Sequence, residues 1–472
     1  MIPSNKKKVK KTYLGSRKMQ NMDHIFREYD IRGLVDTELT AEMTERIGFA
    51  FGSLCPIEHL KIIVGKDNRP SSRSLAEGLM RGLIASGAQV IDIGTVPTPV
   101  VYWAERTSDA HGGIQITGSH NPAEWNGVKM SLNGKPFYGE NIQNLRNFDA
   151  EYGAGDQKGG GSLLRKNVIL DYIKDVTGRF QLRKPLKVVL DCGNGAGSLV
   201  GVEVLEGIGA KVVPLYCESD GTFPNHHPDP TVDENLSDLI MAVQKEGADL
   251  GIGFDGDADR IGAVDDRGNI VRGDLLLLLL GLDILRKNGN AKMIFDVKCS
   301  QVIPEEFTKA GGEAIMWKTG HSLIKNKMTE EGADLAGELS GHIFFADDYF
   351  GFDDAPYCAA RLVEMLSRSE MSLFEMLKGF NVYQSTPEIR IDIPENRKKE
   401  IIDAAAQHFG KLYEVLDVDG VRILFEGGWG LLRASNTQPI LVARFEAEKL
   451  DQLQEIRSEI EEWLETKGVL VQ

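Results

Sequence analysis

Cysteine, long apolar runs and basic charge are all scarce in this 472-residue chain. The five cysteines are scattered and form no C-x-x-C pair, which excludes a disulfide framework and a structural zinc site. We therefore expect a reducing, cytoplasmic location. The longest apolar run, residues 275–282, is far shorter than the roughly 20 residues that cross a membrane, so no membrane partner is expected.

The charge balance also excludes a class of partner. Lys and Arg total 54 against 70 Asp and Glu, which gives a formal net charge of −16. A polyphosphate backbone repels such a chain, so nucleic-acid binding is not expected. Residues 1–22 are locally basic but lack the apolar segment of a secretory signal. We expect a disordered tail there, with a transit peptide as the alternative.

Three stretches repeat one pattern of apolar strand, glycine-containing loop, helix and second strand. They cover residues 61–94, 187–216 and 292–317. Strands that alternate with helices in this way are typical of βαβ units with parallel strands. After residue 383 the pattern changes to strands at 388–393, 421–427, 430–435 and 440–448 and helices at 395–409 and 450–465.

The predicted fold class is therefore α/β. We expect three similar α/β domains with mixed, mostly parallel sheets, followed by a smaller C-terminal α+β domain. A glycine-rich stretch at 153–162 and a turn at 265–268 mark the first two boundaries. The expected division is a tail at 1–22 and domains at 23–163, 164–267, 268–383 and 384–472.

The segment DGDADR places Asp255, Asp257 and Asp259 in a loop between two expected strands. Alternate side chains of an extended loop point to one side, and three carboxylates there suit Mg²⁺. The alternative is an acidic surface turn, which the mutual repulsion of the carboxylates disfavours. An EF-hand is excluded because Arg260 stands where the sixth position needs glycine. The glycines of GIGFDG match a dinucleotide fingerprint only by letter, since no helix follows them.

Three other polar loops could carry chemistry. TGSHNP presents Ser119 beside His120, with Lys129 downstream, and such a serine could be an activated nucleophile. GELSGH offers a carboxylate that could accept hydrogen bonds from two sugar hydroxyls. RASNTQP offers donors that could hold a phosphate without a metal. For each loop taken alone, an ordinary polar turn is the alternative.

Taken together, the motifs resemble a known family. FREYDIRG, TGSHNP, NGVK, FPNHHPDP, DGDADR, KTGHS, GELSGH and RASNTQP occur in the order seen in the α-D-phosphohexomutases. The chain is most similar to the bacterial phosphomannomutase/phosphoglucomutase branch, from about residue 26 to its C-terminus. The resemblance implies four domains around a central cleft. It also implies an isomerase that interconverts mannose or glucose 1-phosphates and 6-phosphates through a phosphoserine and a hexose 1,6-bisphosphate.

The resemblance further implies roles for individual residues. Ser119 would carry the phosphoryl group, and Mg²⁺ would be held by Asp255, Asp257 and Asp259 against it. The implied catalytic residues are Ser119, Lys129, His321, His120, Arg32 and Arg260, with Lys129 and His321 as the acid–base candidates. The implied substrate-binding residues are Glu338, Ser340, His342, Lys298, Arg433, Ser435, Asn436, Thr437 and Tyr29.

One position departs from the branch: Leu339 stands in the sugar loop where methionine is more usual. Phosphoglucosamine mutases carry glutamine there, so the apolar leucine favours glucose and mannose phosphates. A phosphoglucosamine mutase remains an alternative, as do a metal-dependent sugar-phosphate phosphohydrolase and a non-catalytic sugar-phosphate-binding protein. The expected partner is a small phosphosugar, and the oligomeric state is left open between monomer and dimer.

Overall fold

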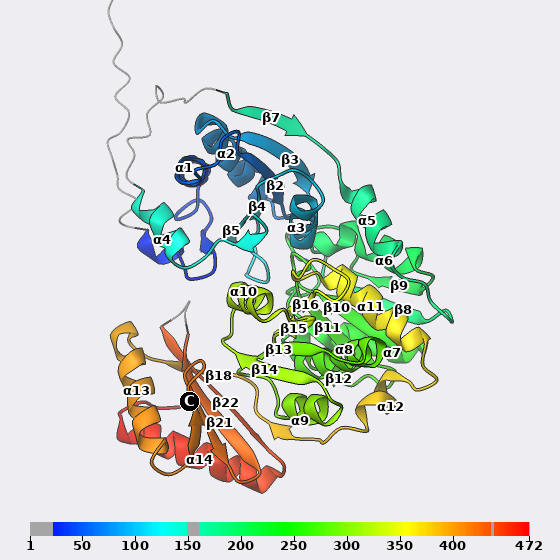
Figure 1. Cartoon of the computed structure of the whole chain (residues 1–472), viewed down its shortest axis with the longest axis vertical. Coiled ribbons are helices and arrows are strands. Elements are labelled where there is room, and N and C mark those ends of the chain that lie inside the picture. Colours follow the sequence, from blue (N-terminus) through cyan, green and yellow to red (C-terminus); the bar gives the residue numbers. More distant parts are fainter. Residues whose placement is uncertain (1–21, 149–159, 436–438, 472) are drawn as a thin grey trace, which may run out of the picture.

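The computed structural model describes residues 22–148, 160–435 and 439–471. Four units follow one another along the chain in an arc, with the first, in blue, and the fourth, in orange and red, at its two ends (Figure 1). The predicted tail, apart from Met22, and most of the glycine-rich stretch at 153–162 lie outside the described residues. The expected class of three α/β units and a smaller fourth unit is confirmed.

The first unit is a mixed sheet in the order β1-β5-β4-β2-β3-β7, with β6 beside β5. Its central strands β2 and β4 are buried, and α2 packs on the sheet through Leu75, Leu79 and Leu83, which recur every four residues. Its elements are η2 (Asp23–Ile25), β1 (Ile31–Leu34), α1 (Ala41–Leu54), β2 (Lys61–Lys66), α2 (Ser72–Ala85), β3 (Gln89–Thr95), α3 (Thr98–Arg106), β4 (Gly112–Ile116), β5 (Trp125–Leu132), β6 (Lys135–Pro136), α4 (Glu140–Asn147) and β7 (Ser162–Arg165).

The second unit has the strand order β12-β11-β10-β8-β9. Strands β8, β9 and β10 are parallel, and β11 returns antiparallel to β10. The DGDADR loop is therefore the connection between two buried neighbouring strands, as predicted. The elements are α5 (Ile169–Thr177), β8 (Lys187–Asp191), η3 (Ala196–Leu199), α6 (Gly201–Gly207), β9 (Lys211–Leu215), η4 (Asp233–Leu236), α7 (Ser237–Glu246), β10 (Leu250–Phe254), β11 (Ile261–Asp265) and β12 (Ile270–Val271).

The third unit repeats this plan with the strand order β14-β13-β15-β16. The leucine-rich run that the sequence showed lies in α8, whose residues are buried on nearly all sides. The elements are α8 (Gly273–Asn288), β13 (Lys292–Asp296), α9 (Val302–Lys309), β14 (Glu313–Trp317), α10 (His321–Glu331), β15 (Leu335–Gly337), β16 (Ile343–Phe345), α11 (Ala355–Ser367) and α12 (Leu373–Leu377).

The fourth unit is antiparallel, in the order β17-β22-β21-β20-β19 with β18 on β22. The strands and helices expected after residue 383 are present, and the short strands β17 and β19 are additional. The expected helix at 395–409 begins with one 3-10 turn after Pro394. The elements are β17 (Gln384–Ser385), β18 (Ile389–Asp392), η5 (Glu395–Arg397), α13 (Lys398–Phe409), β19 (Glu414–Leu416), β20 (Val421–Phe425), β21 (Gly428–Ala434), β22 (Ile440–Ala447) and α14 (Leu450–Thr466).

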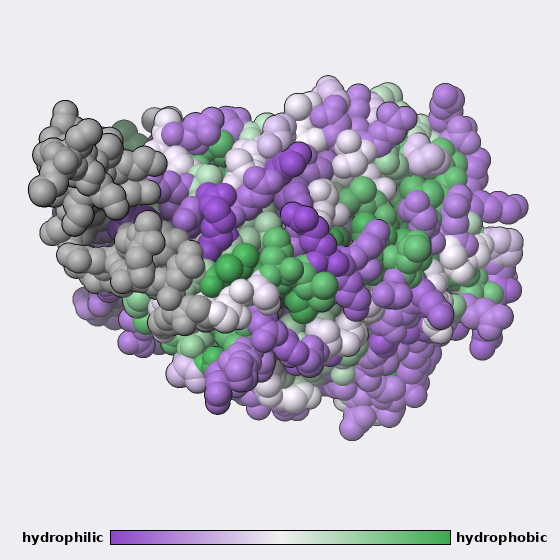
Figure 2. Space-filling model, turned by 90° about the horizontal axis from the view of Figure 1, so that it is seen from above, coloured by the Kyte–Doolittle hydropathy of each residue, from purple (hydrophilic) through white to green (hydrophobic). Residues whose placement is uncertain are grey.

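The sheets continue slightly past the expected boundaries at 163 and 267. Strand β7 pairs with β3 through Arg165, and β12 pairs with β11 through Val271. One apolar core runs through parts of the first three units, whereas the fourth unit has a core of its own. Hydrophilic side chains cover much of the face seen in Figure 2, with smaller apolar areas among them. No described helix is long and apolar enough to cross a membrane.

Candidate active site

Ser119 lies in the loop between β4 and β5, in a left-handed backbone conformation with φ of 51°. A non-glycine residue rarely adopts this conformation, and here the surrounding contacts hold it. Arg69, whose side chain is fully buried, donates from Nη2 to the carbonyls of Ser119 (2.7 Å) and Asn121 (2.6 Å). Asp67 accepts from the Gly118 amide at 3.1 Å. Two residues that closely follow β2 therefore hold the Ser119 loop in place through hydrogen bonds.

The DGDADR loop meets the serine loop from the second unit. The Oγ of Ser119 donates to Oδ2 of Asp255 at 3.1 Å. Close approach requires Gly256, because a Cβ there would lie 2.4 Å from the carbonyl oxygen of Ser119. The predicted extended loop is wrong. Ala258 is left-handed (φ 57°) and Asp255 Oδ1 accepts from the Asp259 and Arg260 amides, so a tight turn, and not strand alternation, gathers the carboxylates.

The three aspartates could hold a metal ion. Their ligand oxygens lie within 4.8 Å of one another, and all three side chains are buried. The Oδ1 atoms of Asp257 and Asp259 have no hydrogen-bond partner, although leaving such buried atoms unpaired is costly. A hard divalent cation with oxygen ligands would satisfy them, so the donor set fits Mg²⁺.

Lys129 neutralises part of the negative charge of this loop. Lys129 Nζ lies 2.8 Å from Asp257 Oδ2 and 2.5 Å from Asp259 Oδ2. Burial opposes its charge, but these carboxylates outweigh burial and raise the pKa of Lys129. Burial likewise opposes the charge on Asp257, yet Lys129 and Thr98 lower its pKa. Burial and the two neighbouring carboxylates raise the pKa of Asp255 well above its usual value.

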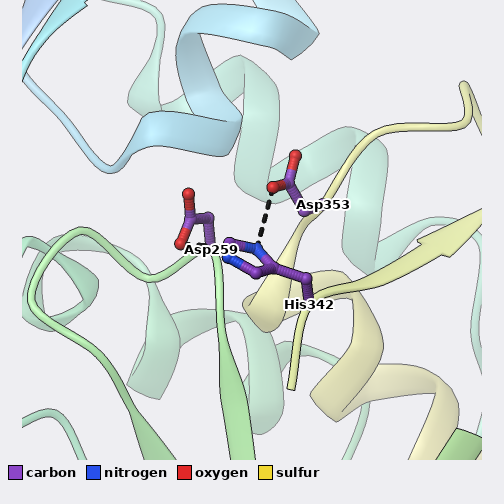
Figure 3. A group of neighbouring side chains, drawn as sticks. All are labelled: Asp259, His342 and Asp353. Carbon is purple, nitrogen blue, oxygen red and sulfur yellow. Dashed lines mark ion pairs between the residues drawn. The ribbon is translucent and has the colours of Figure 1, made fainter. Parts of the chain in front are cut away.

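The DGDADR loop, residues 255–260, is called the metal loop from here on. His342 connects it to the third unit (Figure 3). Arg260 donates from Nε to His342 Nε2 at 2.9 Å. His342 Nδ1 lies 2.9 Å from Asp353 Oδ2 and 3.7 Å from Asp259 Oδ1. Because Arg260 can only donate, Nε2 is the unprotonated nitrogen, and the ring proton sits on Nδ1, facing the carboxylates.

Two further histidines border the same cluster. His321, the first residue of α10, stacks on His342 with ring centroids 5.4 Å apart. Burial and the Lys325 cation lower the pKa of His321 well below its usual value. His120 Nδ1 lies 3.1 Å from Ser119 Oγ, and burial with Arg260 and Arg32 lowers its pKa as well. Both rings are therefore neutral near pH 7 and can accept a proton.

The GELSGH loop has its carboxylate already oriented. Glu338 accepts from the Gly320 amide and from Ser340 Oγ, each at 2.9 Å. Next to Gly320, the Thr319 carbonyl accepts from Tyr29 Oη of the first unit at 3.0 Å, and the Thr319 amide donates to Asp419 of the fourth unit at 3.1 Å. The KTGHS segment is therefore the point at which three units meet.

The other positively charged side chains expected in the site each form an ion pair with a carboxylate. Arg433 forms an ion pair with Asp419 at 2.9 Å. Lys298 is buried and pairs with Glu388 at 2.6 Å. Arg32 pairs with Asp30 at 2.7 Å and donates to Asn121 of the serine loop at 2.8 Å. Ser435 is buried at the end of β21, and its amide donates to Ile440.

The structure thus brings most of the expected residues into two connected groups. One contains Ser119, His120, Lys129, Asp255, Asp257, Asp259, Arg260, His321, His342 and Arg32. The other, across the KTGHS segment, contains Glu338, Ser340, Tyr29 and Arg433, with Lys298 and Ser435 on the third and fourth units. Asn436 and Thr437 lie outside the described residues.

Sequence reasoning missed several residues that shape the site. Arg69 and Asp67 support the serine loop, Thr98 Oγ1 donates to Asp257 at 2.5 Å, and Asp353 and Asp419 hold partners on other elements. The polar run DNRPSS directly after β2 was the one local signal for the first pair. No local sequence signal marks Thr98, Asp353 and Asp419, because each of them contacts a residue on another element.

Comparisons with known proteins agree across all four units, from residue 23 to residue 462. Sequence models for phosphoglucomutase/phosphomannomutase match residues 23–151, 170–268 and 272–383 as alpha/beta/alpha domains I, II and III, and residues 388–462 as the C-terminal domain. A phosphomannomutase/phosphoglucomutase of Pseudomonas putida is 47% identical over 440 residues, covering 92% of this chain and 94% of the relative. A crystal structure of a phosphoglucomutase/phosphomannomutase family protein from Burkholderia thailandensis has a TM-score of 0.88 at 39% identity, covering 94% and 97%. A more distant structure, the Aspergillus fumigatus N-acetylphosphoglucosamine mutase in complex with GlcNAc-6P and magnesium, shares the fold at 13% identity and a TM-score of 0.58, covering 94% and 98%.

Proposed function

We propose that this chain, which belongs to the phosphoglucomutase/phosphomannomutase family and interconverts hexose 1-phosphates and hexose 6-phosphates, carries the transferred phosphoryl group on Ser119. One observation supports this role above the others. The Ser119 hydroxyl, on a strained and clamped loop, lies 3.1 Å from the first of three buried aspartates. Among the described residues, no other serine hydroxyl is hydrogen-bonded to one of these three aspartates.

In the proposed reaction, phosphoserine 119 gives its phosphoryl group to the free hydroxyl of a bound hexose phosphate. The bond from the serine oxygen to phosphorus breaks as the bond from the sugar oxygen forms, and the product is a hexose 1,6-bisphosphate. The bisphosphate turns over, and its other phosphoryl group returns to Ser119. Transfer of this kind depends mainly on positioning and on neutralising charge.

Asp255, Asp257 and Asp259 would hold Mg²⁺, which is the finer identity that we propose for the metal ion. Bound there, the ion would offset negative charge on the transferring phosphoryl oxygens. The magnesium in the distant N-acetylphosphoglucosamine mutase structure is consistent with this choice. Lys129 and Arg260 add fixed positive charge beside the same loop.

The proton of the attacking sugar hydroxyl needs an acceptor. Lys129 is held protonated by two carboxylates, so we assign it a charge-neutralising role. His321 is partly buried, neutral and stacked on His342, so we assign it the acid–base role. His120 and Arg32 position the serine loop, one beside the Ser119 hydroxyl and the other on Asn121.

The sugar and its distal phosphate would be held across the KTGHS segment. Glu338 and Ser340 would bind the sugar hydroxyls, and Arg433, Ser435, Asn436 and Thr437 the phosphate that is not reacting. Lys298, His342 and Tyr29 would border the same substrate. Glucose and mannose differ only at C2, so hydroxyl recognition at O3 and O4 would accept both sugars.

A coupled assay tests the proposal. With glucose 1-phosphate, Mg²⁺ and a trace of glucose 1,6-bisphosphate, Ser119→Ala should lose almost all turnover but keep substrate affinity. Ser74→Ala, an exposed serine on α2, is the matched control and should remain active. Intact-mass measurement should find one phosphoryl group on the wild type and none on Ser119→Ala.

The same assay separates the alternatives. Release of free phosphate as fast as glucose 6-phosphate would favour a phosphohydrolase, and full activity in Ser119→Ala would refute the phosphoserine.

A cytoplasmic location remains part of the proposal, supported by five cysteines that are all free thiols.

A further inference from the structure

Two cysteines of the second unit lie in contact and take no part in the reaction described above. The Sγ atoms of Cys192 and Cys217 are 3.3 Å apart, although the residues are 25 positions apart in the chain. Cys192 is fully buried and Cys217 is half-buried. The other three cysteines, Cys55, Cys299 and Cys358, are all buried.

The backbone holds this pair in place. Strands β8 and β9 are parallel neighbours, with Asp191 opposite Leu215, and the two cysteines follow at the same end of the sheet. The Cys192 amide donates to the Leu215 carbonyl at 3.2 Å. A disulfide needs sulfur atoms about 2 Å apart, so closing the bond requires an approach of only about 1 Å.

We propose that Cys192 and Cys217 are a redox modification site, at which a peroxide forms a reversible disulfide that disturbs the neighbouring metal loop. The Cys217 thiolate attacks one oxygen of hydrogen peroxide, the O–O bond breaks, and hydroxide leaves to become water. The resulting sulfenic acid is attacked by the Cys192 sulfur as its proton departs, the S–O bond breaks, and a second water forms. Two thiols are oxidised by two electrons, one peroxide is reduced to two waters, and a small thiol reverses the change.

The two thiols differ in accessibility and in pKa, as these two reaction steps require. Cys217 is the more accessible of the two thiols, and its contact with the Cys192 thiol lowers the pKa of Cys217. The same interaction, together with burial, raises the pKa of Cys192. Cys217 is therefore the thiol that reacts with peroxide, and Cys192 is the resolving partner.

A short chain of backbone contacts connects the pair to the metal loop. Cys217 follows Tyr216, a left-handed residue whose carbonyl accepts from the Asn194 amide at 2.8 Å. Two residues further, the Ala196 amide donates to the Gly256 carbonyl at 2.9 Å. A Cβ on Gly195 would lie 2.6 Å from the same carbonyl, so the 194–196 loop packs directly against Gly256.

The experiment treats the purified full-length enzyme with hydrogen peroxide and maps its disulfides by non-reducing peptide mass spectrometry. We expect a peptide pair linked through Cys192 and Cys217. We also expect a fall in turnover of roughly tenfold or more, since small misplacements at a reacting centre are costly, and recovery after dithiothreitol. The effect on turnover rests on the proposed role of the metal loop, whereas the link itself is read by mass alone.

Matched variants make the outcome decisive. Cys217→Ser removes a half-buried thiol and should keep both its fold and its activity after peroxide treatment. Cys55→Ser, in the first unit, should lose activity reversibly as the wild type does. Absence of the Cys192–Cys217 link, or a link that leaves turnover unchanged, would overturn the proposal. Equal peroxide sensitivity of Cys217→Ser would overturn it too.

Discussion

The carboxylate of Asp353 faces three nitrogen-bearing side chains at once. Lys325 Nζ and His342 Nδ1 each lie 2.9 Å away, and His321 Nδ1 lies 3.7 Å away. The group is completely buried, yet the Lys325 cation and the contact with His342 outweigh burial and lower the pKa of Asp353 well below its usual value. This one carboxylate therefore holds His342, whose other ring nitrogen accepts from Arg260, in place beside Lys325.

We predict that Asp353→Asn lowers kcat for glucose 1-phosphate by roughly a hundredfold, the size expected when acid–base groups lose their support. KM should stay near the wild-type value, because Asp353 is not expected to contact the sugar. The pH dependence of kcat should shift, which a purely structural defect would not cause.

Asp354→Asn is the matched control for this prediction. It alters the adjacent buried carboxylate, which bonds tyrosines and not the histidines. Similar losses in both variants would mean that the defect is general to this turn, and the assigned role of Asp353 would fail.

Among the elements, α11 has an unusual N-terminus. Its N-cap residue, Asp354, accepts from the Tyr357 amide at 2.9 Å and from the hydroxyls of Tyr172 and Tyr349, each at 2.8 Å. Asp354 thereby connects α11 to α5 of the second unit. Burial nonetheless raises its pKa from 3.8 to about 6, so the native state favours the protonated carboxyl.

This shift predicts a pH dependence of stability. Below about pH 4 the carboxyl is protonated in both states. Between about pH 4 and 6 the unfolded chain ionises first, so the native state loses up to about 3 kcal/mol of relative stability as pH rises. In Asp354→Asn this loss should be absent. Denaturant unfolding at pH 4.5 and pH 7 measures it, and parallel changes in variant and wild type would contradict the prediction.

At the scale of the whole molecule, the fourth unit is joined to the third by a small apolar cluster of Val297, Trp429 and Leu431 and by buried polar contacts. Its core contains none of the described residues of the first three units. The joint includes the fully buried Arg422, which donates to the carbonyls of Val297 (2.7 Å) and Cys299 (3.0 Å) and lies 3.8 Å from the centre of the Trp429 ring. These carbonyls flank Lys298, so the joint also positions a site residue.

We predict that Arg422→Met weakens this joint by about 2–4 kcal/mol, because two buried carbonyls lose their donor. Differential scanning calorimetry should then show the fourth unit unfolding at a lower temperature than the other three. Arg390→Met changes an exposed arginine of β18 in the same unit and should leave the profile unchanged. A single, unshifted transition in Arg422→Met would refute this account.

The sequence by itself determined the elements and the chemistry-bearing loops. Apolar periodicity is a local property, so it predicted the three βαβ repeats and a smaller α+β fourth unit, and the motifs between the strands located Ser119 and the three aspartates. Tertiary structure alone decided how these loops meet. Arg69 acts on a loop 50 positions away, Thr98 on Asp257, and Asp419 on Thr319, and no local pattern encodes such contacts. It also decided the tight turn at Ala258, because that left-handed backbone is stabilised by packing against neighbouring loops and not by the residue itself.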